Sequence, residues 1–187
     1  MKKIILFITC AFVTSSALAD ELSQYQSEAR AVAMPFLKKL GAANQQAVSA
    51  GGHDSAVQVC KDIAPAMAGD ISRQTGWKLT RVSLQVRNPL LGTPDAWEQK
   101  QLQDFAARAA TGEKAETIEA SEIVSEPAGK SYRFMKAIAL QPGCVACHGT
   151  AIPDDVKARL HSDYPHDQAT GYSVGQIRGA VSIKRPL

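Results

Sequence analysis

The stretch KSYRFMKAIALQPGCVACHG, residues 130–149, contains the two features that decide how the chain folds. Its first part, residues 130–140, is rich in aromatic and apolar side chains and predicts a β-strand. Pro142-Gly143 interrupts that pattern and leads directly into Cys144-Val145-Ala146-Cys147-His148. The sequence therefore predicts a β-strand that is followed directly by a motif of two cysteines and a histidine.

The motif has the spacing C-x-x-C-H, which is the attachment sequence for c-type haem. Two thiols three positions apart can each add to a haem vinyl group, and the histidine that follows can reach the iron. We therefore predict one covalent haem c, with Cys144 and Cys147 as thioether residues and His148 as an axial ligand. A redox C-x-x-C pair, half of a zinc site or a simple disulfide are the alternatives. The sequence has neither a thioredoxin-like pattern around the motif nor a second ligand pair for zinc.

The first residues resemble an export signal. Lys2 and Lys3 precede an apolar run over residues 4–13, and Ala17-Leu18-Ala19 supplies small residues for a signal peptidase. We predict a signal peptide over 1–19, cleaved after Ala19, and a periplasmic protein without stable membrane insertion after cleavage. An uncleaved anchor and a lipoprotein modified at Cys10 are less consistent with these residues, because the run is short and Cys10 comes early in it.

Length and composition predict one domain, residues 20–187. The chain has 187 residues, of which 45% are hydrophobic, so it can bury one core. Its formal charge of +3 and the lack of a polybasic run give no electrostatic reason to expect a nucleic acid partner.

Helices are predicted in the first part of the chain. Apolar residues recur every three or four positions from 22 to 40, which predicts a long amphipathic helix that Pro35 kinks or divides and that ends near Gly41. A short helix is predicted over 43–50, and a further one from 54 to Gly69. The apolar stripe of that last helix consists of Val57, Cys60, Ile63, Ala64 and Met67.

Strands mixed with helices are predicted after Gly76. Residues 81–87 alternate between apolar and polar, as do 179–184, and 118–124 form a weaker strand pattern. Helices are expected over 93–112, capped by Thr93, and over 154–160. This order predicts an α+β domain with an antiparallel sheet flanked by helices, and the strands argue against a four-helix-bundle cytochrome.

Several groups of residues together resemble a known family: single-haem c-type domains with a PAS-like fold, which occur alone or as extracytoplasmic sensing parts of signalling proteins. The resemblance implies that the haem lies against the sheet, with His148 as one axial ligand and Cys60 as the other. The residues that carry it are Val59-Cys60-Lys61, Ala64-Pro65, Leu79-Thr80-Arg81-Val82-Ser83, Arg87-Asn88-Pro89, Cys144-Val145-Ala146-Cys147-His148-Gly149, Tyr164-Pro165, Gly171-Tyr172, Gly175 and Ile177-Arg178-Gly179-Ala180.

The second axial ligand has other candidates when the residues are considered without the family. An inward-facing cysteine on a helix is usually a core residue. Cleavage after Ala19 would leave three cysteines, however, and an odd number cannot all pair within the chain. Met67 shares the stripe with Cys60 and is the best substitute. The remaining side chains of suitable chemistry are Met34, Met135, His53, His161 and His166.

Three arginines, Arg81, Arg87 and Arg178, are candidates for contacts to the haem propionates, because guanidinium matches carboxylate geometry. An equally good interpretation places them on the solvated face of strands.

The function predicted is that of a periplasmic haem protein acting as a redox or small-ligand sensor, through release of Cys60 on reduction. The alternative is a low-potential electron-transfer cytochrome, since a thiolate ligand favours ferric iron. Either function requires the c-type cytochrome maturation machinery and an unidentified redox or signalling partner. An enzyme is not expected, because a peroxidase would need His53 or His161 beside the iron and no spacing places them there.

Overall fold

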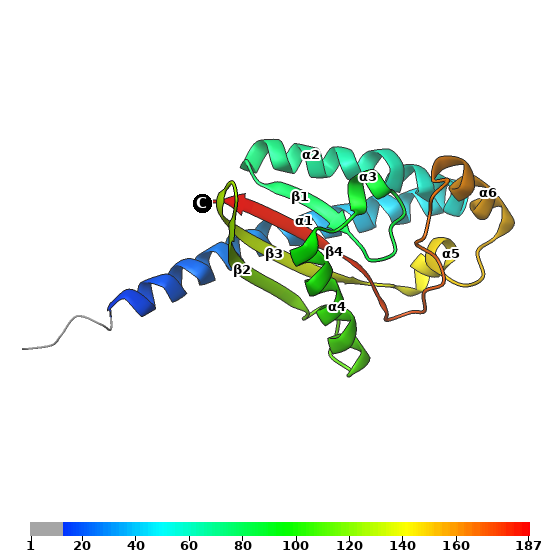
Figure 1. The fold of residues 1–187 in the computed structure, drawn as a ribbon. Helices are drawn as coiled ribbons and strands as arrows, with labels where there is room; N and C mark the ends of the chain where they lie inside the picture. Colours follow the sequence, from blue (N-terminus) through cyan, green and yellow to red (C-terminus); the bar gives the residue numbers. More distant parts are fainter. Residues whose placement is uncertain (1–12) are drawn as a thin grey trace, which may run out of the picture.

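The computed structural model describes residues 13–187. Most of the predicted signal peptide lies outside the described residues, and its end, 13–19, begins the first helix (Figure 1). The elements in chain order are α1 (Val13–Gln58), the π turn η1 (Val59–Ile63), α2 (Ala64–Thr75), β1 (Lys78–Val82), α3 (Pro89–Gly92), α4 (Ala96–Ala110), β2 (Glu119–Glu126), β3 (Gly129–Ala139), the 3₁₀ turn η2 (Pro142–Cys144), α5 (Val145–His148), α6 (Asp154–Asp163) and β4 (Ile177–Pro186).

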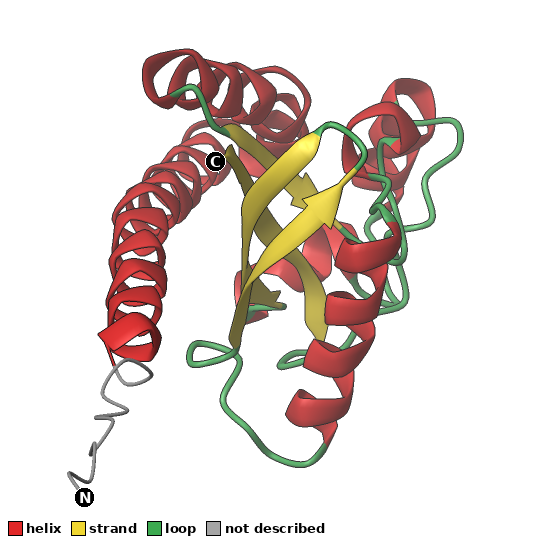
Figure 2. Ribbon diagram, turned by 60° about the vertical axis from the view of Figure 1, so that its left-hand side comes forward, coloured by secondary structure: helices red, strands yellow, loops and turns green. Residues whose placement is uncertain are grey.

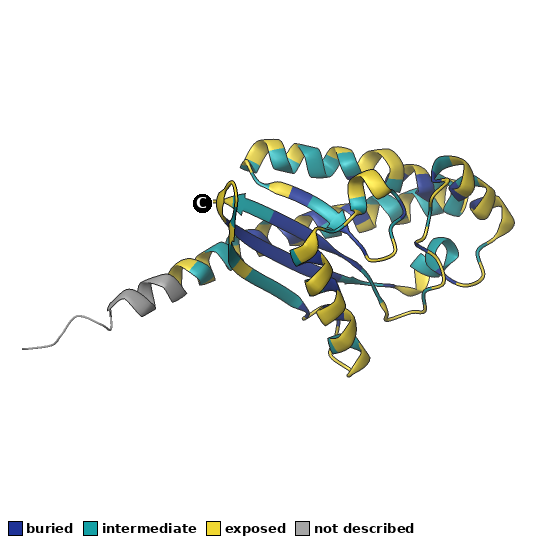
Figure 3. Cartoon of the chain, viewed as in Figure 1, coloured by how far each residue is buried: buried dark blue, intermediate teal, exposed yellow. Residues whose placement is uncertain are grey.

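The four strands form one antiparallel sheet in the order β1-β4-β3-β2. Helices α1 and α4 lie on opposite sides of it (Figure 2). Because side chains alternate across a strand, Tyr132 and Phe134 of β3 pack toward α1, whereas Met135 and Ala137 pack toward α4. Buried residues concentrate in β3 and β4 at the centre of the sheet (Figure 3). The predicted α+β architecture with a long N-terminal helix is confirmed.

Helix α1 is longer than the sequence pattern predicts. It continues through Pro35 and Gly41, and the non-helical residues inside it are Gly51 and Gly52, the latter with a φ of 74°. Pro35 removes the hydrogen bond to the carbonyl of Ala31, but both residues are exposed, so water can satisfy that carbonyl. The predicted division at Pro35 and the predicted end at Gly41 are therefore wrong.

The helix predicted from 54 to Gly69 differs from the structure in two ways. It contains the π turn η1, in which the backbone N–H of Ala64 donates to the carbonyl of Val59, five residues earlier. It also continues past Gly69 to Thr75, because a glycine inside a helix costs only about 1 kcal/mol. Gly76 ends it in the left-handed conformation, with a φ of 72°.

The strand predicted over 81–87 lies earlier in the chain, at Lys78–Val82. Strand β1 ends at Val82, and a loop follows in which the backbone N–H of Ser83 donates to the carbonyl of Gly92. The alternation of apolar residues beyond Val82 thus belongs to a loop, in which Leu84 is exposed. The helix predicted from Thr93 begins at Ala96 instead, because Asp95 and Glu98 form a reciprocal capping box.

Among residues 13–187, the structure has no helix with both the length and the apolar character needed to cross a bilayer.

Candidate functional site

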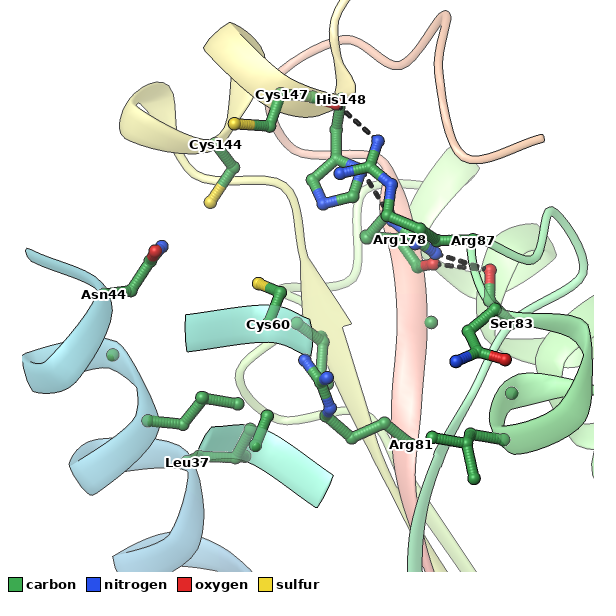
Figure 4. A pocket seen from close by; sticks show the side chains of 18 of the residues that line it. Leu37, Asn44, Cys60, Arg81, Ser83, Arg87, Cys144, Cys147, His148 and Arg178 are labelled. Atoms are coloured by element: carbon green, nitrogen blue, oxygen red, sulfur yellow. Dashed lines mark hydrogen bonds between the residues drawn. The ribbon is translucent and has the colours of Figure 1, made fainter. Parts of the chain in front are cut away.

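A cavity of about 590 Å³ lies at one end of the sheet, on its α1 side. Its walls come from α1, η1, α2, β1, the loop after β1, and the ends of β3 and β4. The lining is mainly apolar and the volume is in the usual range for a ligand site. Cys60, Cys144, Cys147 and His148 all line this cavity, so the structure brings together the four residues predicted to hold a cofactor (Figure 4).

The end of strand β3 positions the cysteine motif. Leu140 pairs its backbone N–H and carbonyl with Gln176 and Gly175, which fixes the chain where the strand ends. The turns η2 and α5 follow immediately and contain the whole motif. The backbone N–H of Gly149 then donates to the carbonyl of Val145 at 2.8 Å and closes the turn.

The ring of His148 is held by the backbone. Its Nδ1 lies 2.7 Å from the carbonyl oxygen of Ala169, which can only accept, so Nδ1 carries the proton and Nε2 keeps its lone pair. Nε of Arg178 lies 3.1 Å from the same Nδ1 and, because both nitrogens then carry hydrogens, this is a close contact rather than a hydrogen bond. Burial, followed by the charges of Arg178 and Arg87, lowers the pKa of His148 to about 2. The imidazole is therefore neutral, which is the form that binds iron.

Arg87 is buried and fastens the motif to the rest of the domain. Its guanidinium donates to the carbonyl of Cys147 at 2.6 Å, to the carbonyl of Ala169 at 3.3 Å and to Oδ2 of Asp167 at 3.0 Å. Its charge also lies 6.0 Å from the ring centre of Tyr164. These partners occupy Arg87, and a contact to a propionate stays a prediction.

Arg178 and Arg81 line the cavity with different surroundings. Arg178 donates to Oγ of Ser83 at 2.7 Å and to the carbonyl of Gln85 at 3.2 Å, and burial lowers its pKa to about 10. The side chain of Arg81 makes no hydrogen bond or ion pair with any residue in the described part of the chain. Its guanidinium extends toward Cys60 (Figure 4). Of the three predicted arginines, Arg81 is thus the one whose charge is left for a ligand.

Cys60 faces the motif from the other side of the cavity (Figure 4). It lies in η1, and the extra residue of this π turn rotates the following positions, so that Ile63, expected on the buried stripe, is 43% exposed. π turns occur often at functional sites. The sequence does not reveal this turn, because the apolar spacing around Cys60 also fits a regular helix.

The alternative axial ligands are distributed over the molecule. Met67 packs against the core between α1 and the sheet, and Met135 lies on the opposite face of the sheet. Met34, His161 and His166 are exposed. Of these six candidates, all in the described residues, His53 alone lines the cavity.

Other features of the cavity were not found from the sequence. Asn44 lines it, and Oδ1 of this residue is buried without a hydrogen-bond partner in the described part of the chain. Tyr164 also lines it, and burial raises its pKa to about 12. Burial raises the pKa of Cys147 to about 11, and the three described cysteines are free thiols, so Cys144 and Cys147 form no disulfide here.

Comparisons with known proteins extend over most of the chain. The sequence model of the Tll0287-like family matches residues 14–186. Among solved structures, the crystal structure of the cyanobacterial haem protein Tll0287 is similar, with a TM-score of 0.62 over 82% of this chain and 91% of that chain. The two sequences are 22% identical, so this likeness concerns the fold. No curated protein sequence matches the chain.

Proposed function

The chain belongs to the Tll0287-like family, and from that premise we propose that it is an exported, periplasmic c-type haem protein with one haem in the cavity. Cys144 and Cys147 hold the haem through thioether bonds, and His148 and Cys60 are its axial ligands. The protein works by redox change rather than as an enzyme, and the working domain is residues 20–187. The family resemblance found in the sequence is confirmed, whereas attachment, ligation and location are the content of this proposal.

One observation carries the proposal: two candidate iron ligands, Cys60 and His148, face one cavity from opposite elements, beside the two thiols of the attachment motif. The surroundings also suit a flat apolar group that carries carboxylates. The lining is mainly apolar, and the unpaired guanidinium of Arg81 offers these carboxylates a charged partner. The buried amide of Asn44 is left for a polar group of the ligand.

When bound, the haem supplies a one-electron redox couple, whose potential a thiolate ligand lowers. The protein's own residues hold the ligands in place. The carbonyl of Ala169 fixes the tautomer and direction of the His148 ring, and Arg87 holds the backbone of Cys147. Such outer contacts orient a metal ligand and are needed for full affinity.

Redox or small-ligand sensing is the role that the position of Cys60 favours. This residue lies in a π turn between two helices, so a change in its ligation acts directly on the packing of those helices. The alternative is low-potential electron transfer. Electron transfer is favoured by Leu91, which lines the cavity and is 53% exposed. A partner protein that contacts Leu91 would come close to the haem.

The experiment is to purify the exported protein and test it for covalent haem. Haem staining after denaturing electrophoresis, together with intact mass, is expected to show one haem on the parent and none on a Cys144→Ser, Cys147→Ser variant. Electron paramagnetic resonance of the ferric parent should show a low-spin thiolate signal that is lost in Cys60→Ala. An unmodified polypeptide mass would refute the proposal.

Carbon monoxide separates the two roles. A sensor that releases Cys60 on reduction should bind carbon monoxide in the reduced state, whereas a carrier should keep both ligands and exclude it.

A further inference from the structure

Helix α6 (Asp154–Asp163) connects the two halves of the candidate site. Val156 and Leu160 on its buried side pack with Val57, three residues before Cys60, in a cluster that also contacts Cys147. Tyr164, the residue after the helix, belongs to the same cluster and lines the cavity. The helix therefore contacts both the segment that carries Cys60 and the segment that carries the attachment motif.

A polar network at the end of α6 fastens it to the π turn. Oδ1 of Asp163 accepts a hydrogen bond from Nζ of Lys61 at 2.7 Å, and Oδ2 accepts one from Nε of Arg159 at 2.6 Å. Arg159 in turn donates through Nη2 to Oε1 of Gln58 at 2.5 Å. Gln58 and Lys61 flank Cys60 in the chain, so the network holds the backbone on both sides of this cysteine.

The Asp163 carboxylate is the centre of this network. Its side chain is 9% exposed, whereas Lys61 and Arg159 are 42% and 34% exposed. Both of its oxygens accept from cations, and hydrogen bonds of this kind are stronger than neutral ones. A π turn is rare, and Lys61 lies within this one while Gln58 immediately precedes it, so contacts on these two side chains act directly on the turn.

We propose that Asp163 is a positioning residue that holds the π turn, and thereby the Cys60 thiol, in reach of the iron opposite His148. This inference rests on the proposed ligation by Cys60. Asp163 itself does not line the cavity, and it acts through Lys61 and Arg159.

The test is a cyanide titration of the purified ferric holoprotein, because cyanide competes with the native sixth ligand. In Asp163→Asn, which keeps the shape of the side chain, we expect the apparent affinity for cyanide to rise about tenfold, in line with the loss of charge-assisted hydrogen bonds. Lys61→Gln, at a more exposed side chain, should act in the same direction. Asp70→Asn is the matched control, because Asp70 pairs with Arg73 on an exposed part of α2 and neither residue lines the cavity.

Four variants, one of them the control, make the outcomes distinct. Cys60→Ala must first change the low-spin signal, and if it does not, the proposed ligation fails and this inference with it. If Cys60→Ala changes the signal but Asp163→Asn and Lys61→Gln bind cyanide within twofold of the parent, the positioning role is overturned and the ligation stands. A rise in both variants but not in Asp70→Asn supports the inference. Should Asp163→Asn fail to fold, Lys61→Gln decides alone.

Discussion

Arg87 is expected to contribute more to stability than any other arginine of the cavity, and Arg87→Met tests this. Methionine keeps much of the side-chain volume but leaves the carboxylate of Asp167 and the carbonyl of Cys147 without their guanidinium partner. The side chains of Arg87 and Asp167 are only 9% and 11% exposed, so solvent screens the attraction between their charges little.

The expected loss can be worked from these contacts. Removing one partner of a buried ion pair costs about 3–5 kcal/mol. Asp167 also accepts a backbone hydrogen bond from Ala169 at 2.7 Å, which is retained, so the lower value of about 3 kcal/mol applies. For a domain of this size that lowers Tm by about 6–12 °C.

Urea unfolding followed by circular dichroism measures the change directly. The matched control is Arg73→Met, because Arg73 pairs with Asp70 at the surface, where the two side chains are 72% and 59% exposed, and this variant should change the free energy of unfolding by less than about 0.5 kcal/mol. The reasoning is refuted if Arg87→Met unfolds within about 1 kcal/mol of the parent, or if both variants lose the same stability.

Three further outcomes are expected. Arg81→Gln should lower the reduction potential of the haem-loaded protein in a potentiometric titration, because a positive charge in the cavity favours the more negative reduced state; an unchanged potential would place Arg81 away from the haem. Gly179→Ala should destabilise the protein by about 1–3 kcal/mol in urea, because its methyl group would lie 2.4 Å from a backbone oxygen of β1, and a parent-like midpoint would contradict that contact. The pKa of Asp163 is held below its ordinary value of 3.8 by hydrogen bonds from its two cationic partners, so the stability that they supply is present above pH 3.8 and is lost as the pH falls below it. Asp163→Asn should therefore be less stable than the parent at pH 7, with a difference that shrinks in acid; a constant difference would argue against these bonds.

The parts of the fold that were predicted correctly depend on local pattern. The strand before the motif is rich in aromatic and apolar residues, and the final strand alternates Val181 and Ile183 with small or polar residues, so each can be predicted from its own residues. The C-x-x-C-H motif can be read from the sequence because its five residues are consecutive. In the same way, Gly112 ends the helix after Asp95 with a φ of 95°, close to where it was predicted to end.

The errors arise where tertiary contacts decide between local alternatives. Residues 83–87 alternate like a strand, but Ser83 uses its hydroxyl and backbone to close a loop against Gln85 and Gly92. Pro35 is tolerated because the freed carbonyl is exposed, which no spacing reveals. The π turn at Cys60 differs from a regular helix by one residue, and its apolar spacing fits both.

The three arginines of the cavity show why the hydrogen-bond partners of a side chain have to be read from the structure. Arg81, Arg87 and Arg178 have the same chemistry and were given the same candidate role. What distinguishes them is the set of acceptors that distant segments supply: Arg87 meets the backbone of the motif and an aspartate 80 residues away, and Arg178 meets the loop after β1. Arg81 lies on the edge strand β1, and no described acceptor reaches it. Arg81 is half-buried, so water can reach its guanidinium while the side chain lines the cavity. Arg81 is therefore the arginine that we propose meets a carboxylate of the haem, because guanidinium matches carboxylate geometry and the described residues leave this side chain without a partner.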